Sequence, residues 1–313
     1  MVDVSIVIVN YNSFPHLDNC LRTLFLETKE ITFEVIVVDN GSSEKGKNEI
    51  ISKYPKVKFV LNETSKGFAA ANNQGFKEAS GKYILMLNND VVFIEDVISK
   101  VVKFSKENSN RIIIGCKLLN EDRTHQISIV DFDTLPNLFG ENFFLYKLFP
   151  GSKTLSKYHL NDELITEPIE VDAVKGAFLF LPHTILKEFG GLDERFLFYY
   201  EETDLCYRWK SKGGKVYYYP NGELIHIGGA STDSNLWFKF RNQHVSKIQF
   251  FQKHFRGIKF LLAVSIHELG LLLRFPLYFV IGLIKGNKSL IKKSGCYLRS
   301  VFVYPAKNQK AIA

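Results

Sequence analysis

Short apolar runs alternate with amphipathic stretches along the first 120 residues of the chain. The apolar runs have the length and the β-branched and aromatic content of buried strands, and we expect strands at residues 4–9, 33–38, 57–61, 83–87 and 112–118. The stretches between them have the apolar spacing of helices, which we expect near residues 16–26, 45–53, 68–79 and 95–107. This alternation predicts an α/β fold whose mostly parallel sheet is covered by helices on both faces.

The second half of the chain is less regular. Residues 120–170 have little periodicity and several Pro, Gly and Asp residues, so we interpret them as a loop-rich insertion of the kind that often determines acceptor or partner specificity. Apolar strand character returns at residues 171–182. After a Gly-Gly-Leu-Asp turn, we expect a helix at the end of residues 196–212, short strands at 216–220 and 224–227, and a basic helix at 235–255.

Residues 257–285 are strongly apolar but carry interruptions. These are Lys259, His267, Glu268, Arg274 and Pro276. The longest uncharged run, residues 275–284, is shorter than the roughly 20 residues that a membrane-spanning helix needs. An interfacial amphipathic helix or helical hairpin, followed by the basic residues 285–299, is favoured. Packing in a protein core or dimer interface and true spanning are the alternatives.

Composition and charge narrow the class of protein. The chain has 313 residues, of which 46% are apolar and 23% charged, so it can bury a substantial core. The net charge of +7 is uneven, because residues 221–313 hold 14 Lys/Arg and 3 Asp/Glu and the remainder is acidic. The basic C-terminal third favours an anionic partner such as a membrane or a substrate. No recognised nucleic-acid motif occurs there, and we expect no nucleic acid as partner.

Four widely spaced cysteines form no CxxC pair, which is typical of structural thiols in a reducing compartment. The N-terminal residues lack a basic region followed by an apolar core, so we expect no secretory signal. We therefore predict a cytoplasmic protein that lies peripherally on the inner face of the plasma membrane.

Polar residues follow three of the predicted strands at their carboxyl ends, where open α/β sheets bind ligands. Asn10 and Asn12 follow the first strand and Asp39 the second, and the apolar run 83–87 leads into Asn88, Asn89 and Asp90. A carboxylate at the position of Asp39 can accept a hydrogen bond from a nucleobase imide, and one at Asp90 can hold a divalent cation that carries phosphates. Turn formation and helix capping are the alternatives for both. No GxGxxG motif follows the first strand, which disfavours a nicotinamide-dependent dehydrogenase.

Three further stretches carry candidate chemistry. The small residues that begin at Gly67 let helix-start amides approach a phosphate or ribose, near Asn72 and Asn73, or pack the helix tightly on the sheet. Glu201, Glu202 and Asp204 repel one another, which raises the proton affinity of at least one carboxylate, as suits a general base. An acidic first helical turn is the alternative. His226, beside a Gly pair, can complete a metal or diphosphate site or be structural.

Together these motifs resemble the family-two inverting glycosyltransferases of GT-A fold, particularly their bacterial rhamnosyltransferase-like branch. The resemblance covers residues 3–255 and rests on six motifs in the same order. They are Val9-Asn10-Tyr11-Asn12, Val38-Asp39-Asn40-Gly41-Ser42, residues 67–75, Leu87-Asn88-Asn89-Asp90, Gly190-Gly191-Leu192-Asp193-Glu194-Arg195-Phe196 and residues 201–208.

The resemblance implies a role for each site residue. Asp39 would contact a uracil or thymine base. Asp90 would bind Mg²⁺ or Mn²⁺, with His226 near the metal and diphosphate, and Glu202 would be the catalytic base. Asn88 departs from the family's DxD pattern and leaves one carboxylate there. The other expected nucleotide contacts are Asn10, Asn12, Gly67, Asn72, Asn73 and Asn89.

The resemblance also implies the domains and the reaction. Residues 1–256 would form the GT-A domain, with a nucleotide-binding half at 1–119 and an acceptor half at 120–256, and residues 257–313 a membrane-associating segment. The expected reaction moves L-rhamnose from dTDP-rhamnose to a glycan or lipid-linked glycan in cell-surface polysaccharide synthesis, and an oligomer is possible. The alternatives are a UDP-hexose or UDP-galactofuranose donor, a non-catalytic membrane-peripheral nucleotide-binding protein, and a nucleotidyltransferase. The last would need a Gly-rich basic loop that residues 10–15 lack.

Overall fold

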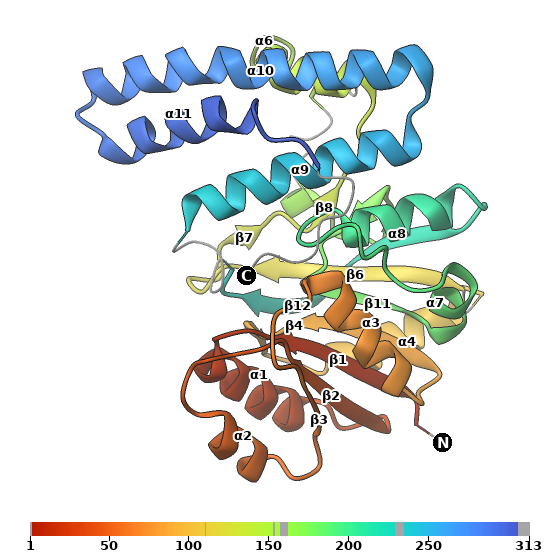
Figure 1. Cartoon of the computed structure of the whole chain (residues 1–313). Coiled ribbons are helices and arrows are strands. Elements are labelled where there is room, and N and C mark those ends of the chain that lie inside the picture. Colours follow the sequence, from red (N-terminus) through yellow and green to blue (C-terminus); the bar gives the residue numbers. More distant parts are fainter. Residues whose placement is uncertain (1, 110, 153, 157–161, 229–234, 306–313) are drawn as a thin grey trace.

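A central β-sheet has the strand order β3-β2-β1-β4-β11-β6-β12-β5 (Figure 1). The computed structural model describes residues 2–109, 111–152, 154–156, 162–228 and 235–305. The first four strands of the sheet are parallel and nearly in register, so their carboxyl ends meet at one edge of the sheet. They are β1 (Val4–Asn10), β2 (Phe33–Asp39), β3 (Lys58–Leu61) and β4 (Tyr83–Asn88).

The other half of the sheet is mixed. Strand β11 (Phe178–Pro182) runs antiparallel to both β4 and β6 (Ile112–Leu119), whereas β12 (Lys215–His226) is parallel to β6 and antiparallel to β5 (Val91–Phe93). The expected α/β fold is thus confirmed, but the sheet is parallel only in part. The two short strands expected at 216–220 and 224–227 are one strand, β12, whose register shifts between Tyr219 and Glu223.

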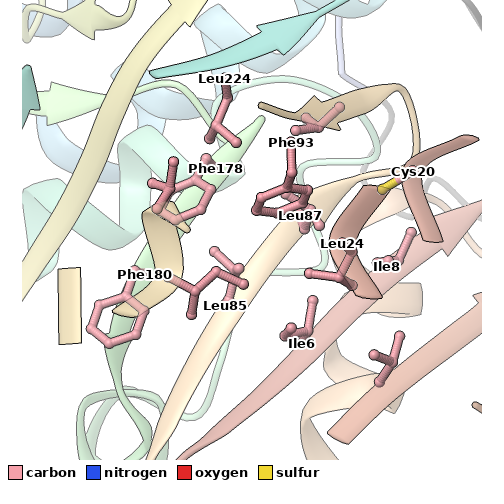
Figure 2. Packing of buried hydrophobic residues seen from close by; sticks show 14 of the residues in the cluster. Ile6, Ile8, Cys20, Leu24, Leu85, Leu87, Phe93, Phe178, Phe180 and Leu224 are labelled. Carbon is pink, nitrogen blue, oxygen red and sulfur yellow. The ribbon is translucent and has the colours of Figure 1, made fainter. Parts of the chain in front are cut away.

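Helices cover both faces of the sheet because alternate strand residues are apolar on each face. Helices α1 (Phe14–Glu27), α2 (Lys47–Lys53) and α4 (Val97–Glu107) pack on one face. Helices α3 (Phe68–Glu78), α7 (His183–Phe189) and α8 (Glu201–Lys210) pack on the other. Figure 2 shows the first core, where Leu85 and Leu87 of β4 lie between Ile6 and Ile8 of β1 and Phe178 and Phe180 of β11. All four cysteines are free and buried, as expected.

Residues 120–174 add short elements to the α/β layer. They are β7 (His125–Gln126), β8 (Ile129–Val130), α5 (Leu135–Asn142), α6 (Leu145–Leu148), η2 (Asp162–Leu164), β9 (Ile169–Glu170) and β10 (Ala173–Val174). Within this region β7 pairs with β6 and β9 pairs with β12, so both belong to the central sheet, whereas β8 and β10 pair with each other in a two-stranded sheet.

Three helices complete the chain at one end of the molecule: α9 (Leu236–His254), α10 (Gly257–Ile284) and α11 (Lys288–Ser300) (Figure 1). Helix α10 has an inverted pattern, because His267, Glu268 and Arg274 are buried against the protein while its outward residues are apolar. Among the described residues it is the one helix that is long and apolar enough, by length and composition, to cross a membrane.

Candidate active site

The polar ends of β1, β2 and β4 form a hydrogen-bonded chain at the carboxyl edge of the sheet. Asn89 donates from Nδ2 to Oδ1 of Asn10 over 2.8 Å, and Asn10 donates from its own Nδ2 to Oδ1 of Asp39 over 3.4 Å. All three side chains are buried. The structure therefore brings together three of the residues that the sequence motifs single out, although they lie up to 79 positions apart in the chain.

Asp39 has a partner that the sequence did not reveal. Its side chain is 1% exposed, and the ammonium of Lys47, the first residue of α2, lies 2.6 Å from Oδ2. A buried carboxylate is costly without a counter-charge, and Lys47 supplies one. The signal that could have identified Lys47 is the pair of lysines, Lys45 and Lys47, at the start of the helix predicted after the Asp39 turn.

Two other predicted nucleotide contacts make structural bonds. Oδ1 of Asn12 accepts hydrogen bonds from the backbone amides of Ser43 and Glu44, at 2.8 and 3.0 Å, and so secures the loop after β2. Asn73 exchanges two hydrogen bonds of 2.9 Å with the backbone of Leu192. These side chains fix loops around the site, and a direct nucleotide contact by either stays a prediction.

Gly67 and Asn72 lie at the first turn of α3. Gly67 has a φ of +88°, and a Cβ there would lie 3.3 Å from the carbonyl oxygen of Leu197, so a side chain would be strained. Asn72 is fully buried and donates to the Phe68 carbonyl over 3.0 Å. Its Oδ1 is one of the buried side-chain oxygens that have no hydrogen-bond partner in the described part of the chain.

Asp90 and His226 form the candidate metal pair. Nε2 of His226 lies 3.3 Å from Oδ1 of Asp90, whose Oδ2 accepts from the Gly228 amide over 3.1 Å. Nδ1 of His226 lies 2.6 Å from Oε1 of Gln126. Because an amide oxygen can only accept, Nδ1 carries the proton and the lone pair is on Nε2. Burial alone would raise the pKa of Asp90, but the adjacent His226 ring and the hydrogen bond from the Gly228 amide outweigh burial, so this pKa lies below its usual value.

Asp90 and His226 supply two of the ligands that a bound Mg²⁺ or Mn²⁺ would need. Oδ1 of Asp90 is buried without a hydrogen bond from the described residues, and carboxylate and imidazole are ligands that Mn²⁺ accepts. No group of three or more His, Cys, Asp or Glu that could hold a metal occurs in the described ranges. The remaining ligands would thus be substrate phosphate oxygens and water. The side-chain amide of Asn88, whose Nδ2 lies 3.2 Å from Nε2 of His226, takes the place of a second carboxylate.

Glu202 lies in the first turn of α8, which follows two tyrosines in left-handed conformation, Tyr199 and Tyr200. Its Oε2 and that of Glu201 are buried and have no hydrogen-bond partner within the described ranges. Burial raises the pKa of Glu202, although amides of the helix start and of Gly176, and the charge of Lys175, oppose the rise. Burial and the charge of Glu202 raise the pKa of Glu201 well above its usual value. Repulsion within this cluster is as the sequence predicts.

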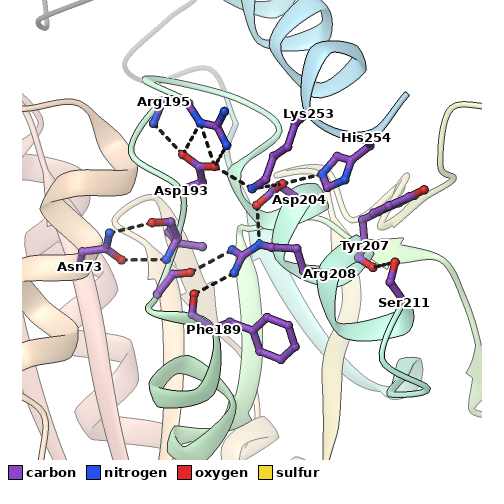
Figure 3. Close-up of polar contacts among 12 residues, drawn as sticks. Asn73, Phe189, Asp193, Arg195, Asp204, Tyr207, Arg208, Ser211, Lys253 and His254 are labelled. Carbon is purple, nitrogen blue, oxygen red and sulfur yellow. Dashed lines mark hydrogen bonds and ion pairs between the residues drawn. The ribbon is translucent and has the colours of Figure 1, made fainter. Parts of the chain in front are cut away.

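Asp204, the third acid of the cluster, is structural (Figure 3). It is fully buried, and its oxygens lie 2.6 Å from Nζ of Lys253, 2.7 Å from Nε2 of His254 and 2.7 Å from Nε of Arg208. Burial alone would raise the pKa of Asp204, but the hydrogen bonds with His254 and Lys253 and the charges of Arg208 and Lys253 outweigh burial, so this pKa lies below its usual value. The sequence leaves Asp204 open between a base and an acidic first helical turn, and the structure assigns it to this buried cluster instead.

Glu202 and Asn88, which precedes Asp90 by two residues, both lie next to one short segment, residues 175–177. The backbone amide of Asn88 donates to the Ala177 carbonyl over 3.0 Å, which fixes Ala177 beside the end of β4. A Cβ on Gly176 would lie 3.5 Å from Cγ of Glu202. Glu202 and the end of β4, which leads into Asp90, therefore both lie beside this segment.

The first half of the chain matches a known family model. Residues 5–157 match the model described as glycosyl transferase family 2. The chain is 22% identical over 267 residues to a low-salt glycan biosynthesis hexosyltransferase of Haloferax volcanii, with 82% of this chain and 80% of the relative covered. It is 25% identical over 246 residues to an N-acetylglucosaminyl-diphospho-decaprenol L-rhamnosyltransferase of Mycobacterium tuberculosis, with 74% and 78% covered.

A solved structure has the same fold. It is a mannosyltransferase from Pyrobaculum calidifontis in complex with GDP-Man and Mn²⁺, which matches with a TM-score of 0.57 and 13% identity over 96% of this chain and 86% of that one. At this identity the likeness concerns the fold alone.

Proposed function

We propose that this chain, which belongs to glycosyltransferase family 2, transfers a sugar with inversion from a nucleotide-diphosphate donor to a glycan or lipid-linked glycan acceptor. The observation that carries the proposal is that Glu202 lies beside Gly176 while Asn88, two residues before Asp90, is bonded to Ala177, so that both candidate groups lie near one segment. An inverting transfer requires the base and the diphosphate site to act on opposite faces of the sugar ring.

Glu202 is the proposed catalytic base. Its Oε2 takes the proton from the acceptor hydroxyl as that oxygen attacks the anomeric carbon, and the nucleoside diphosphate leaves from the other face of the ring. Asp90 and His226 would hold Mg²⁺ or Mn²⁺, which when bound supplies positive charge to the diphosphate leaving group. Gln126 keeps the lone pair of His226 on Nε2, where a cation can use it.

The proposed donor is dTDP-L-rhamnose, in agreement with the rhamnosyltransferase name of one relative. A UDP-hexose or UDP-galactofuranose donor is the alternative, because another relative is a hexosyltransferase. Screening UDP- and dTDP-sugars by thermal shift with Mg²⁺ or Mn²⁺, then measuring product by mass spectrometry, distinguishes these donors. Stabilisation by neither class would reject the proposed function, and binding without turnover would favour a non-catalytic nucleotide-binding protein.

The proposed acceptor carries a lipid, and the proposed location is an anionic membrane surface. Exposed apolar side chains gather on the outer face of α10 and extend to the α5–α6 segment, which packs against it. They include Leu148, Phe149, Leu269, Leu273, Val280 and Ile284. Lys285, Lys288 and Lys292 lie exposed next to this face, so its charge is complementary to anionic lipid.

A further inference from the structure

Lys175 is a partly buried lysine in the loop between β10 and β11. Throughout the described ranges its ammonium has neither an ion pair nor a hydrogen bond. Two cations that contact α8 are different: Arg208 and Lys253 both pair with Asp204, at 2.7 and 2.6 Å. An ammonium that is withdrawn from water without a partner costs free energy. The absence of a partner for the Lys175 ammonium therefore needs an explanation.

The backbone of Lys175 is fixed between the start of β8 and the residue that packs against Glu202. Its amide donates to the Ser128 carbonyl over 2.9 Å, which ties it to the start of β8. The next residue, Gly176, packs against Glu202, and Ala177 is bonded to the end of β4. Lys175 thus begins the segment that contacts both the proposed base and the end of β4, two residues before Asp90.

The carboxylates within range of Lys175 do not satisfy it. Its charge interacts with those of Asp162 and Glu202, but burial outweighs both and lowers the pKa of the ammonium. Asp162 is already 2.6 Å from Nε2 of His125 and accepts from the Ser128 amide over 2.7 Å. Glu202 must accept a proton in the proposed reaction. The anion that completes the environment of Lys175 would therefore come from a ligand.

We propose that Lys175 binds a phosphate oxygen of a substrate diphosphate in the space between Asp90 and Glu202. A lysine ammonium is a compact charge that suits phosphate oxygens. The inference rests on the proposed function, whose substrates supply this diphosphate from two sources. One is the nucleotide-sugar donor, and the other is a lipid-diphosphate acceptor.

The test compares Lys175→Gln and Lys175→Arg with the wild-type protein by calorimetry. Lys210→Gln is the matched control, because Lys210 is also partly buried but pairs with Glu170 at 2.8 Å, away from the site. The ligands are inorganic pyrophosphate, UDP and dTDP, the nucleosides uridine and thymidine, and geranyl diphosphate added to protein saturated with nucleoside diphosphate. We expect Lys175→Gln to bind one diphosphate class at least about tenfold more weakly, with Lys175→Arg close to wild type and Lys210→Gln unchanged.

The outcomes separate the two sources. Weaker binding of UDP or dTDP with unchanged nucleoside binding assigns Lys175 to the donor, and weaker binding of geranyl diphosphate alone assigns it to the acceptor. Equal affinities of Lys175→Gln and wild type for all diphosphates would overturn the inference. If the wild type binds no nucleoside diphosphate, the proposed function fails, and pyrophosphate alone decides the role of Lys175. Absence of pyrophosphate binding would then overturn the inference too.

Thermal stability without ligand gives a second, independent readout. Because the ammonium is unpartnered, Lys175→Met should leave the melting temperature unchanged or raise it. A fall of several degrees would mean that Lys175 has a structural partner, and this would contradict the inference even if diphosphate binding also weakened.

Discussion

The hydroxyl of Tyr200 donates to Oδ2 of Asp133 over 2.9 Å. Tyr200 precedes α8 and has a left-handed backbone with a φ of 72°, which is unfavourable for a side chain of its size. Asp133 lies just before α5 and also pairs with Lys247 at 3.2 Å. The segment between β6 and β11 thus holds the residue that directly precedes the acidic first turn of α8. We infer that this bond contributes to the position of Glu202.

Tyr200→Phe should therefore reduce both stability and turnover. Loss of a hydrogen bond to a buried carboxylate should lower the free energy of unfolding by about 1–3 kcal/mol, as measured by urea denaturation. If Glu202 also shifts, kcat should fall about tenfold while the KM for the donor is unchanged. Tyr207→Phe is the control, because the Tyr207 hydroxyl has no hydrogen bond to any described residue. Equal effects of the two variants would show that the Asp133 bond does not act on the base.

Glu202→Gln should fold normally and bind nucleotide, but lose turnover by roughly 10²- to 10⁴-fold, the usual effect of removing a general base. Steady-state kinetics and calorimetry on the same preparation measure the two effects separately. Glu201→Gln is the matched control on the neighbouring acid. It should keep most activity and move the acid limb of the kcat profile to lower pH, because the repulsion that raises the carboxyl pKa values is reduced. Near-wild-type turnover of Glu202→Gln would remove Glu202 from the proposed role.

Gln126→Leu should weaken metal-dependent nucleotide binding although Gln126 is no proposed ligand. Its Oε1 accepts from Nδ1 of His226 over 2.6 Å, and loss of such a partner commonly costs 10- to 100-fold in metal affinity. Titration of Mn²⁺ into the nucleotide-bound protein, followed by electron paramagnetic resonance, measures the change. Asp90→Ala should have a larger effect at the same site. Wild-type Mn²⁺ affinity in both variants would reject the Asp90–His226 pair as the metal site.

The first four strands could be predicted to within about a residue because each is a continuous apolar run that ends in polar residues. The direction of β11 could not, since a strand buried on both faces has the same pattern whichever way it runs. Residues 220–222, Pro-Asn-Gly, have turn composition but form an irregularity within β12. The sequence could not show that Asn12 and Asn73 form hydrogen bonds with loop backbone, because an asparagine after a strand or in a helix can bind either a ligand or a backbone amide. Only the tertiary structure shows that both side chains bind backbone amides.

The pH dependence of stability should include a contribution from Glu268 on the inner face of α10. Burial raises the pKa of this carboxyl to about 7 from a usual value of 4.5. Its contribution is therefore fully present below about pH 4.5 and is lost as the pH rises through 7. Glu268→Gln should gain stability relative to wild type over that interval, by about 1–2 kcal/mol with allowance for solvent screening.

Urea denaturation of Glu268→Gln and wild type between pH 4 and 8 measures this difference. His244 and His267 lie against Glu268, and burial lowers both of their pKa values, to about 4 for His244. Their effect has the opposite sign, since it removes stability as the pH falls below 6.5, so the effect of Glu268 is measured from the change between pH 6.5 and 8. A difference that does not change with pH would contradict the raised pKa of Glu268.

The outer face of α10 should bind anionic vesicles through its apolar residues. Leu269 and Leu273, one helical turn apart, are 54% and 42% exposed. Glutamate at both positions would place two anions in the lipid interface, so the double variant Leu269→Glu/Leu273→Glu should bind phosphatidylglycerol vesicles at least about tenfold more weakly in sedimentation. Leu26→Glu is the matched control, because Leu26 is also 54% exposed but lies on α1, at the opposite end of the molecule (Figure 1). Wild-type vesicle binding by the double variant would reject the membrane proposal, and a wild-type dimer that the two glutamates convert to a monomer would instead assign this face to a second copy of the chain.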